Sequence, residues 1–296
     1  MPGTNLNKAR LLEVAATTGR AIIILLIAGL LGAALIRMAP GFQTSGQELD
    51  PRLTRSSIEA LRHRDSEQGN LFVSYVRFLS NLAHGDAGTS RVFRQPVAQL
   101  IRERAATTVR SVALGWIVAW IAASLLAAAV ALKSRAAPLI ISTLLSGVLL
   151  SVPSAVLATF CLLFDLPPAA AIAAVVFPRV FPYLYEQLRS NVNRPHVIMA
   201  RARGLSGARL FFWHILPGVL GGILGLAGVS VTLALGAAIP VEALADSPGL
   251  GQLAWRAALG RDLPVLVAIT LLLTAVTVLV NLLSDVAVDR LGARAQ

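Results

Sequence analysis

Residues 215–241 read ILPGVLGGILGLAGVSVTLALGAAIPV and contain no charged side chain. An α-helix rises about 1.5 Å per residue and the hydrocarbon core of a bilayer is roughly 30 Å thick, so about 20 apolar residues suffice to cross it. The run exceeds that length and lies between Arg209 and Glu242. It therefore predicts a membrane-spanning helix.

Five further segments are candidate spans because they are apolar and nearly free of charge: 21–36, 111–132, 136–164, 166–185 and 263–284. The first is slightly short, but flanking arginines can extend their side chains to the membrane surface. The segment 166–185 is the weakest, because it contains Arg179 and four prolines. Together with 215–241, these segments predict an all-α membrane protein with six transmembrane helices.

The composition supports a membrane protein. Of 296 residues, 56% are hydrophobic and 14% are charged, whereas soluble domains carry about 25% charged residues. The net charge of +11 would suit nucleic acid, but the arginines lie mainly outside the apolar runs and no groove of aromatic and basic residues is evident. We therefore expect no nucleic-acid partner. The single cysteine, Cys161, excludes an internal disulfide and a multi-cysteine metal site.

The distribution of arginine predicts the orientation. Residues 186–214 hold five arginines and one acid, whereas basic and acidic residues balance in 242–262. Because short cytoplasmic loops are enriched in basic residues, 186–214 and both termini are expected in the cytoplasm. Three parts follow: a leader with the first transmembrane helix (1–37), an extracytoplasmic segment (38–108) and a five-helix core (109–296).

The extracytoplasmic segment contains a helical pattern. After Asn70, a plausible helix N-cap, apolar residues recur at near-helical spacing: Leu71, Phe72, Tyr75, Val76, Leu79 and Leu82. This pattern predicts a helix, most simply one that lies on the bilayer surface.

Catalytic patterns are missing from the sequence. A phosphate-binding loop needs Gly-Lys-Ser/Thr, but Leu132 precedes the only Lys-Ser pair, Lys133-Ser134. The four histidines fall in loops or at the border of a span, where no catalytic pair forms. Arg179 is almost alone as an ionisable group within a span, which is weak support for an ion-coupled carrier. We expect no catalytic, cofactor or metal site on this chain.

Residues 199–218, MARARGLSGARLFFWHILPG, interrupt the apolar runs. Pro195 suits the first turn of a helix and Gly204 its end, Ser206 can cap a second short helix, and Pro217 begins the next span. Small residues stand where a partner backbone could approach closely: Ala200, Ala202 and Gly204. The alternative is a plain cytoplasmic loop anchored by its arginines.

This segment resembles the cytoplasmic "EAA" loop of ABC importer permeases, E-A-A-x-x-x-G followed after nine residues by I-x-L-P. The positions that match in register are Ala200, Gly204, Leu216 and Pro217. The sequence departs from the motif at Ile198, Met199 and His214, which stand in place of Glu, Ala and Ile.

Other motifs over residues 70–290 resemble the B-type permeases of the dipeptide/oligopeptide/nickel family. An outer "Tyr…GD-G-S" pattern is matched at Tyr75, Gly85, Asp86, Gly88 and Ser90. An "S-x-P" pattern is matched at Ser151-Val152-Pro153, and "E…PGLG…A…RD-P" at Glu242, Pro248, Gly249, Leu250, Gly251, Ala257, Arg261, Asp262 and Pro264. The family often has Leu-Pro where this chain has Ala105-Ala106.

The resemblance implies a subunit of a bacterial inner-membrane importer for peptides or similar small solutes. It would pair with a C-type permease, one or two cytoplasmic ATPases that hold ATP and Mg, and an extracytoplasmic solute-binding protein, within the lipid bilayer. The chain itself would hold no cofactor. A secondary carrier or channel that acts without an ATPase remains the alternative.

The resemblance also implies two sites. The coupling segment (187–214) would contact an ATPase, with Ala200, Arg201, Ala202, Arg203 and Gly204 beside Leu216 and Pro217. The PGLG block would form an outer gate or dock the binding protein, with Glu242 and Asp262 in contact with that protein. From the residues alone, PGLG is also compatible with a simple turn.

Overall fold

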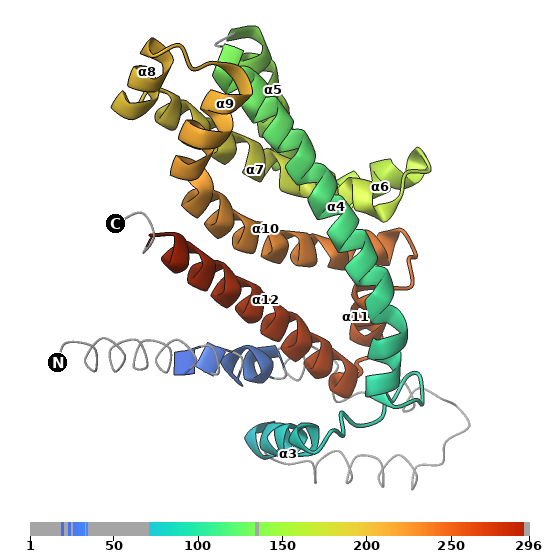
Figure 1. The fold of residues 1–296 in the computed structure, drawn as a ribbon. Helices are drawn as coiled ribbons and strands as arrows, with labels where there is room; N and C mark the ends of the chain where they lie inside the picture. The colour runs from blue at the N-terminus through green and yellow to red at the C-terminus, as the bar shows by residue number, and fades with distance from the viewer. Residues whose placement is uncertain are drawn as a thin grey trace, which may run out of the picture. The chain divides into compact units, whose positions relative to one another are not determined.

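The computed structural model of the chain describes residues 19–20, 23–24, 26–32, 34, 71–133 and 136–292. These residues form helices and connecting turns, with one isolated bridge between Thr89 and Pro96. The described residues between 19 and 34 are helical. The later helices are α3 (Leu71–Ala83), α4 (Val97–Lys133), α5 (Ala136–Ser151), α6 (Ser154–Leu163), α7 (Pro168–Val192), α8 (Pro195–Ala202), α9 (Gly207–Leu210), the π-helix η1 (Phe211–Ile215), α10 (Leu216–Leu244), α11 (Leu250–Leu259) and α12 (Leu263–Gly292). Figure 1 labels all of them except η1. The predicted all-α class is confirmed for this part of the chain.

Four helical segments in the described ranges are long and apolar enough to cross a membrane: Val97–Ala131, Pro168–Val192, Gly207–Leu244 and Leu263–Arg290. They coincide with four of the six predicted spans. The predicted span 21–36 lies partly outside the described residues, so the total of six stays a prediction.

The predicted span 136–164 is wrong as a single straight helix. The chain bends by 101° between Thr143–Ser151 and Ser154–Leu163. Proline lacks an N–H donor and disfavours helical geometry in the residue before it. Pro153 is accordingly the N-cap of α6, with φ −58° and ψ 143°, and α5 ends at Ser151. These residues form either one broken span or a re-entrant pair.

Proline acts differently in α7. Pro168 occupies the first turn, where an N–H would have no helical partner. Pro178 and Pro182 lie inside the helix, and α7 nevertheless continues to Val192. The weak candidate span 166–185 therefore corresponds to a full-length helix, and its Arg179 is exposed.

The chain divides into two compact units, residues 1–103 with 254–275 and residues 104–253 with 276–296. The predicted domain border at 108–109 falls inside α4, which is continuous from Val97 to Lys133. The two parts predicted on either side of this border are therefore connected through one continuous helix, and the division itself stays a prediction.

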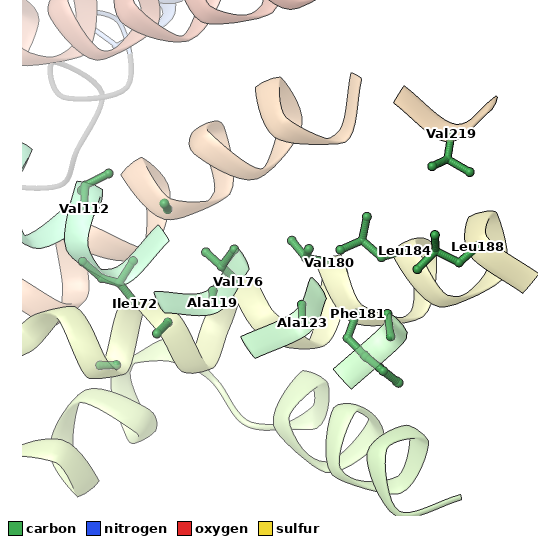
Figure 2. Packing of buried hydrophobic residues seen from close by; sticks show 14 of the residues in the cluster. Val112, Ala119, Ala123, Ile172, Val176, Val180, Phe181, Leu184, Leu188 and Val219 are labelled. Carbon is green, nitrogen blue, oxygen red and sulfur yellow. The ribbon is translucent and has the colours of Figure 1, made fainter. Parts of the chain in front are cut away.

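The core of the second unit is built on α7. Its buried apolar residues recur every fourth position, which forms a stripe along one side of a helix: Ile172, Val176, Val180, Leu184 and Leu188. Figure 2 shows this stripe together with Ala119 and Ala123 of α4 and Val219 of α10, which belong to the same cluster. Because lipid is as apolar as these side chains, close packing and interhelical hydrogen bonds stabilise such a core.

The first unit contains α3 and the beginning of α12. Tyr75 packs against Val267 and Leu271, and its hydroxyl donates to the carbonyl oxygen of Leu26 at 2.9 Å. Burial raises the pKa of this hydroxyl, so it stays protonated and able to donate. The apolar pattern expected after residue 70 therefore forms the predicted helix. Asn70, its expected N-cap, lies outside the described residues.

Candidate functional site

The coupling segment contains the two helices predicted for it. Pro195 begins α8, and Gly204 follows its end with φ +87°. The N–H of Leu205 donates to the carbonyl of Ala200 at 3.2 Å, and that of Gly204 to Arg201 at 3.0 Å. These two bonds form a Schellman motif, in which glycine is favoured because its φ is positive.

The second helix continues directly into a membrane span. Ser206 occupies the N-cap position of α9 as expected, but its side chain makes no capping hydrogen bond. After α9 the chain widens into the π-turn η1, where the N–H of Leu216 donates to the carbonyl of Phe211. Pro217 has no N–H and its ring would clash with the carbonyl four residues earlier in a regular helix. The wider turn lies directly before this proline, and α10 begins at Leu216, one residue before the predicted start at Pro217.

The predicted coupling residues differ in exposure. Arg201, Ala202, Arg203 and Gly204 are exposed together at the end of α8, and Pro217 is exposed as well. Ala200, in contrast, is only 5% exposed and packs in the core, and Leu216 is half-buried against it. Ala200 therefore offers no surface for the close approach of a partner; it joins α8 to its own unit.

Sequence reasoning missed the apolar part of this surface. Ile198 and Met199 of α8 are 55% and 58% exposed, beside the arginines. They stand where the EAA motif has Glu and Ala, so comparison with the motif marks them only as departures from it. Farther along, Phe212 and Trp213 of η1 are exposed too, and exposed aromatic side chains of this kind are enriched at membrane surfaces.

A second group of predicted residues meets at the other end of α10. Glu242 is 0% exposed, and three donors surround its carboxylate. Thr108 Oγ1 donates to Oε2 at 2.9 Å, Ser111 Oγ to Oε1 at 3.0 Å, and the N–H of Gly251 to Oε2 at 2.8 Å. Thr108 Oγ1 in turn accepts the N–H of Leu250 at 2.7 Å. We call these five residues the Glu242 cluster.

The cluster explains the glycines of the PGLG block. A side-chain carbon on Gly251 would stand 2.7 Å from the carbonyl oxygen of Ala238 and from Cα of Ile239. One on Gly249 would overlap the Glu242 carboxylate. Real Cβ atoms do not approach other atoms so closely, so only glycine permits α11 to begin against α10 and its carboxylate.

A chain of polar contacts extends the cluster. Arg104 Nη1 donates to Gln252 Oε1 at 2.9 Å, and Gln252 Nε2 donates to Asp246 Oδ1 at 2.5 Å. Arg104, Thr108 and Ser111 stand at positions i, i+4 and i+7 of α4, which share one face of a helix. Sequence reasoning missed this face, although its spacing was the available signal.

Asp262 belongs to the other compact unit and does not join the cluster. It is 0% exposed, and its Oδ2 accepts the hydroxyl of Ser90 at 2.5 Å and the N–H of Val92 at 3.1 Å. Two of the motifs quoted above, GD-G-S and RD-P, therefore meet here. Its Oδ1 is buried without a hydrogen-bond partner.

Both carboxylates expected to contact a binding protein, Glu242 and Asp262, are buried in this structure, and their contact with such a protein stays a prediction. Each is engaged with donors inside its own unit, and neither reaches the surface of this structure. Pro248 is exposed, whereas Gly249, Leu250 and Gly251 are buried. Any docking by this block would use neighbouring exposed side chains, and that role stays a prediction.

Metal ligation has no visible basis in the described ranges. No group of three or more His, Cys, Asp or Glu side chains lies close enough there to hold an ion.

The described helices that are long and apolar enough to cross a membrane define a multi-span membrane protein, with an exposed basic turn before the segment Gly207–Leu244 and a buried polar cluster near the end of that segment. A family model described as "Binding-protein-dependent transport system inner membrane component" matches residues 105–296. The chain belongs to this family. The match includes the coupling segment, the Glu242 cluster and all of α12.

Similar proteins cover nearly the whole chain. The oligopeptide transport system permease protein AppB of Bacillus subtilis is 26% identical over 298 residues, which cover 90% of this chain and 93% of AppB. The dipeptide transport system permease protein DppB of Lactococcus lactis subsp. cremoris is 23% identical over 271 residues, with 85% and 88% covered.

Proposed function

We propose that this chain is one of the two permease subunits of an ABC importer that carries peptides or similar small solutes. The observation that carries the proposal is the family match over residues 105–296. The names of similar proteins such as AppB and DppB support peptides as the solute class. In this proposal the chain forms half of the pathway in a bacterial inner membrane, with both termini in the cytoplasm.

The partners follow from the same proposal. A C-type permease forms the other half of the pathway, an extracytoplasmic binding protein delivers the solute, and cytoplasmic ATPases bind ATP and Mg. The chain itself performs no catalysis and holds no cofactor. A secondary carrier or channel would instead transport solute without an ATPase.

The end of α8 is proposed to be the contact with an ATPase. Its exposed side chains combine cations, Arg201 and Arg203, with apolar surface, Ile198 and Met199. Exposed apolar side chains next to charged ones are typical of surfaces that bind another protein. Because Ala200 packs in the core, a displacement of the end of α8 is transmitted to the helices that form this core.

Reconstitution tests the whole proposal. The chain, a C-type permease, the ATPases and the binding protein are placed in proteoliposomes, and uptake of labelled peptides is measured with and without ATP. We expect uptake only with ATP and with every component present. Uptake by the purified chain alone would favour a carrier or channel and would overturn the proposal.

Crosslinking tests the contact. A cysteine at Ala202, introduced after Cys161→Ser, is expected to crosslink to an ATPase, because the position is exposed at the tip of α8. A cysteine at exposed Ala258 of α11 is the matched control and should not crosslink. No crosslink from position 202 in any nucleotide state would contradict the proposed contact.

A further inference from the structure

The Glu242 cluster joins three elements at one buried carboxylate. Glu242 belongs to α10, Thr108 and Ser111 to α4, and the N–H groups of Leu250 and Gly251 to the first turn of α11. We propose that Glu242 is the positioning residue that holds α11 closed as the outer gate, and that opening the pathway requires the release of this carboxylate from α11 and α4. The inference rests on the proposed function.

The donors suit a contact that must open. The first N–H groups of any helix have no hydrogen-bond partner within the helix. In α11, the N–H of Leu250 donates to Thr108 and the N–H of Gly251 donates to Glu242. Water can replace each of these hydrogen bonds when the elements separate, so the net loss on opening is small. An apolar seal of the same extent would have to expose its surface to water.

A purely structural contact would be expected to look different. A buried carboxylate loses its hydration, and well-packed apolar side chains often stabilise a fold as well or better. Here the neighbouring positions of the same helices are apolar and buried, Val241 beside Glu242 and Val112 beside Ser111. An acidic side chain with matched hydrogen-bond partners therefore stands beside buried apolar positions of the same helices.

One helical run joins the cluster to the coupling segment. α9, η1 and α10 form an uninterrupted segment from Gly207 to Leu244, which corresponds to about 55 Å at the rise of an α-helix. Glu242 lies at one end and Arg209 at the other. A displacement of the coupling segment therefore reaches the carboxylate through a single element, within one compact unit.

The first test removes hydrogen bonds from the Glu242 cluster while keeping the volume of the side chain nearly unchanged. Thr108→Val removes the acceptor of the Leu250 N–H and a donor to Glu242 at nearly constant volume. In the reconstituted complex, ATP hydrolysis without binding protein should rise about fivefold for each hydrogen bond lost, because gate opening and ATPase closure are coupled. Stimulation by the binding protein should fall by the same factor.

Matched variants separate this effect from general damage. Thr107→Val alters the preceding residue of α4, whose side chain is not among those bonded to Glu242 or Leu250, and should leave hydrolysis unchanged. Glu242→Gln should act more weakly than Thr108→Val. Its amide oxygen can still accept two hydrogen bonds, and Ser111 can turn its hydroxyl to the carbonyl of Thr108, 3.2 Å away.

The second test holds the gate shut. Cysteines at Thr108 and Leu250, combined with Cys161→Ser, place a thiol on α4 and one on the first turn of α11. Oxidation should abolish ATP-driven uptake and a reducing agent should restore it, whereas each single cysteine should be insensitive to oxidant. Uptake at the full rate in the crosslinked complex would overturn the proposal, since α11 would then not move from α4.

The outcomes distinguish the two levels of the argument. If the unmodified complex shows ATP-driven uptake but Thr108→Val keeps its normal stimulation ratio, Glu242 is a structural support and the gate assignment is wrong. If the unmodified complex needs no ATPase for uptake, the proposed function itself fails, and the gate assignment fails with it.

Discussion

A carboxylate buried among membrane helices needs donors, and the two buried carboxylates of this chain differ in how they find them. Both oxygens of Glu242 accept hydrogen bonds, whereas Asp262 has one oxygen with two donors and one with no partner. A fully paired group stabilises its own arrangement, and a half-paired one leaves a cost that its surroundings must offset. The two acids therefore differ in how completely they are hydrogen-bonded, although both are fully buried.

Gly251 gives the sharpest test at the scale of a single residue. Gly251→Ala places a carbon 2.7 Å from the backbone of α10, so α11 must shift. We expect a loss of stability of about 1–3 kcal/mol, typical of overpacking, and impaired uptake. Gly236→Ala, in α10 and with open space around the position, is the control. The unfolding temperature and the uptake of both variants are measured. Equal values for the two variants would show that the contact of Gly251 with α10 is not tight.

Ser230 supports a second polar contact within the membrane. Its hydroxyl oxygen accepts the indole N–H groups of Trp116 and Trp120 at 2.8 and 3.0 Å, and it is 0% exposed. Ser230→Ala leaves both indoles without this acceptor. At about 0.6–2 kcal/mol for an interhelical hydrogen bond, we expect a lower unfolding temperature in detergent. Ser190→Ala, an exposed serine bonded within its own helix, should not change it.

At the scale of elements, proline determines where the membrane helices begin and bend. Pro168 and Pro195 each begin a helix, Pro153 separates α5 from α6, and Pro217 follows the π-turn. The missing N–H is harmless in a first turn, and the chain breaks at Pro153 and widens before Pro217, whereas α7 contains Pro178 and Pro182 and still continues to Val192. The same residue type therefore has opposite effects that depend on its position.

The bend between α5 and α6 is testable by distance measurement. Pro153→Ala restores an N–H at the break and should let the two helices align more closely, since alanine is the best helix former. Spin labels at Leu144 and Leu163, both exposed, should then move apart as the bend of 101° decreases. An unchanged distance would show that packing of α6 against α7 and α10, and not the proline, maintains the bend.

The sequence predicts those features of the fold that depend on neighbours along the chain. The charge-free run 215–241 lies within a span, and Pro195 and Gly204 correctly mark the beginning and end of α8. The break at Pro153 carried a local signal as well. The length of the apolar run, however, outweighed that signal in the prediction of one span.

The Glu242 cluster could not be predicted in the same way. Thr108 and Ser111 are separated from Glu242 by more than 130 positions, and each is an ordinary small polar residue within an apolar helix. Their hydrogen bonds to Glu242 form only when α4, α10 and α11 pack together. An acid that followed a span looked like a surface residue, because most acids are exposed; tertiary packing made it a buried acceptor.

For the molecule as a whole, the assignment of the coupling segment predicts a charge-dependent partner. The double variant Arg201→Glu, Arg203→Glu reverses two exposed positive charges at the end of α8 and should reduce copurification of the ATPases. The unmodified complex should also lose its ATPases as the salt concentration rises, because salt screens exposed charge pairs. Arg77→Glu, an exposed arginine of α3, is the control and should leave copurification intact. Loss of the ATPases from the α8 variant but not from this control would support the contact. Equal retention of the ATPases by both variants would assign the arginines to the orientation of the chain in the membrane, which is the task of basic residues in an ordinary cytoplasmic loop.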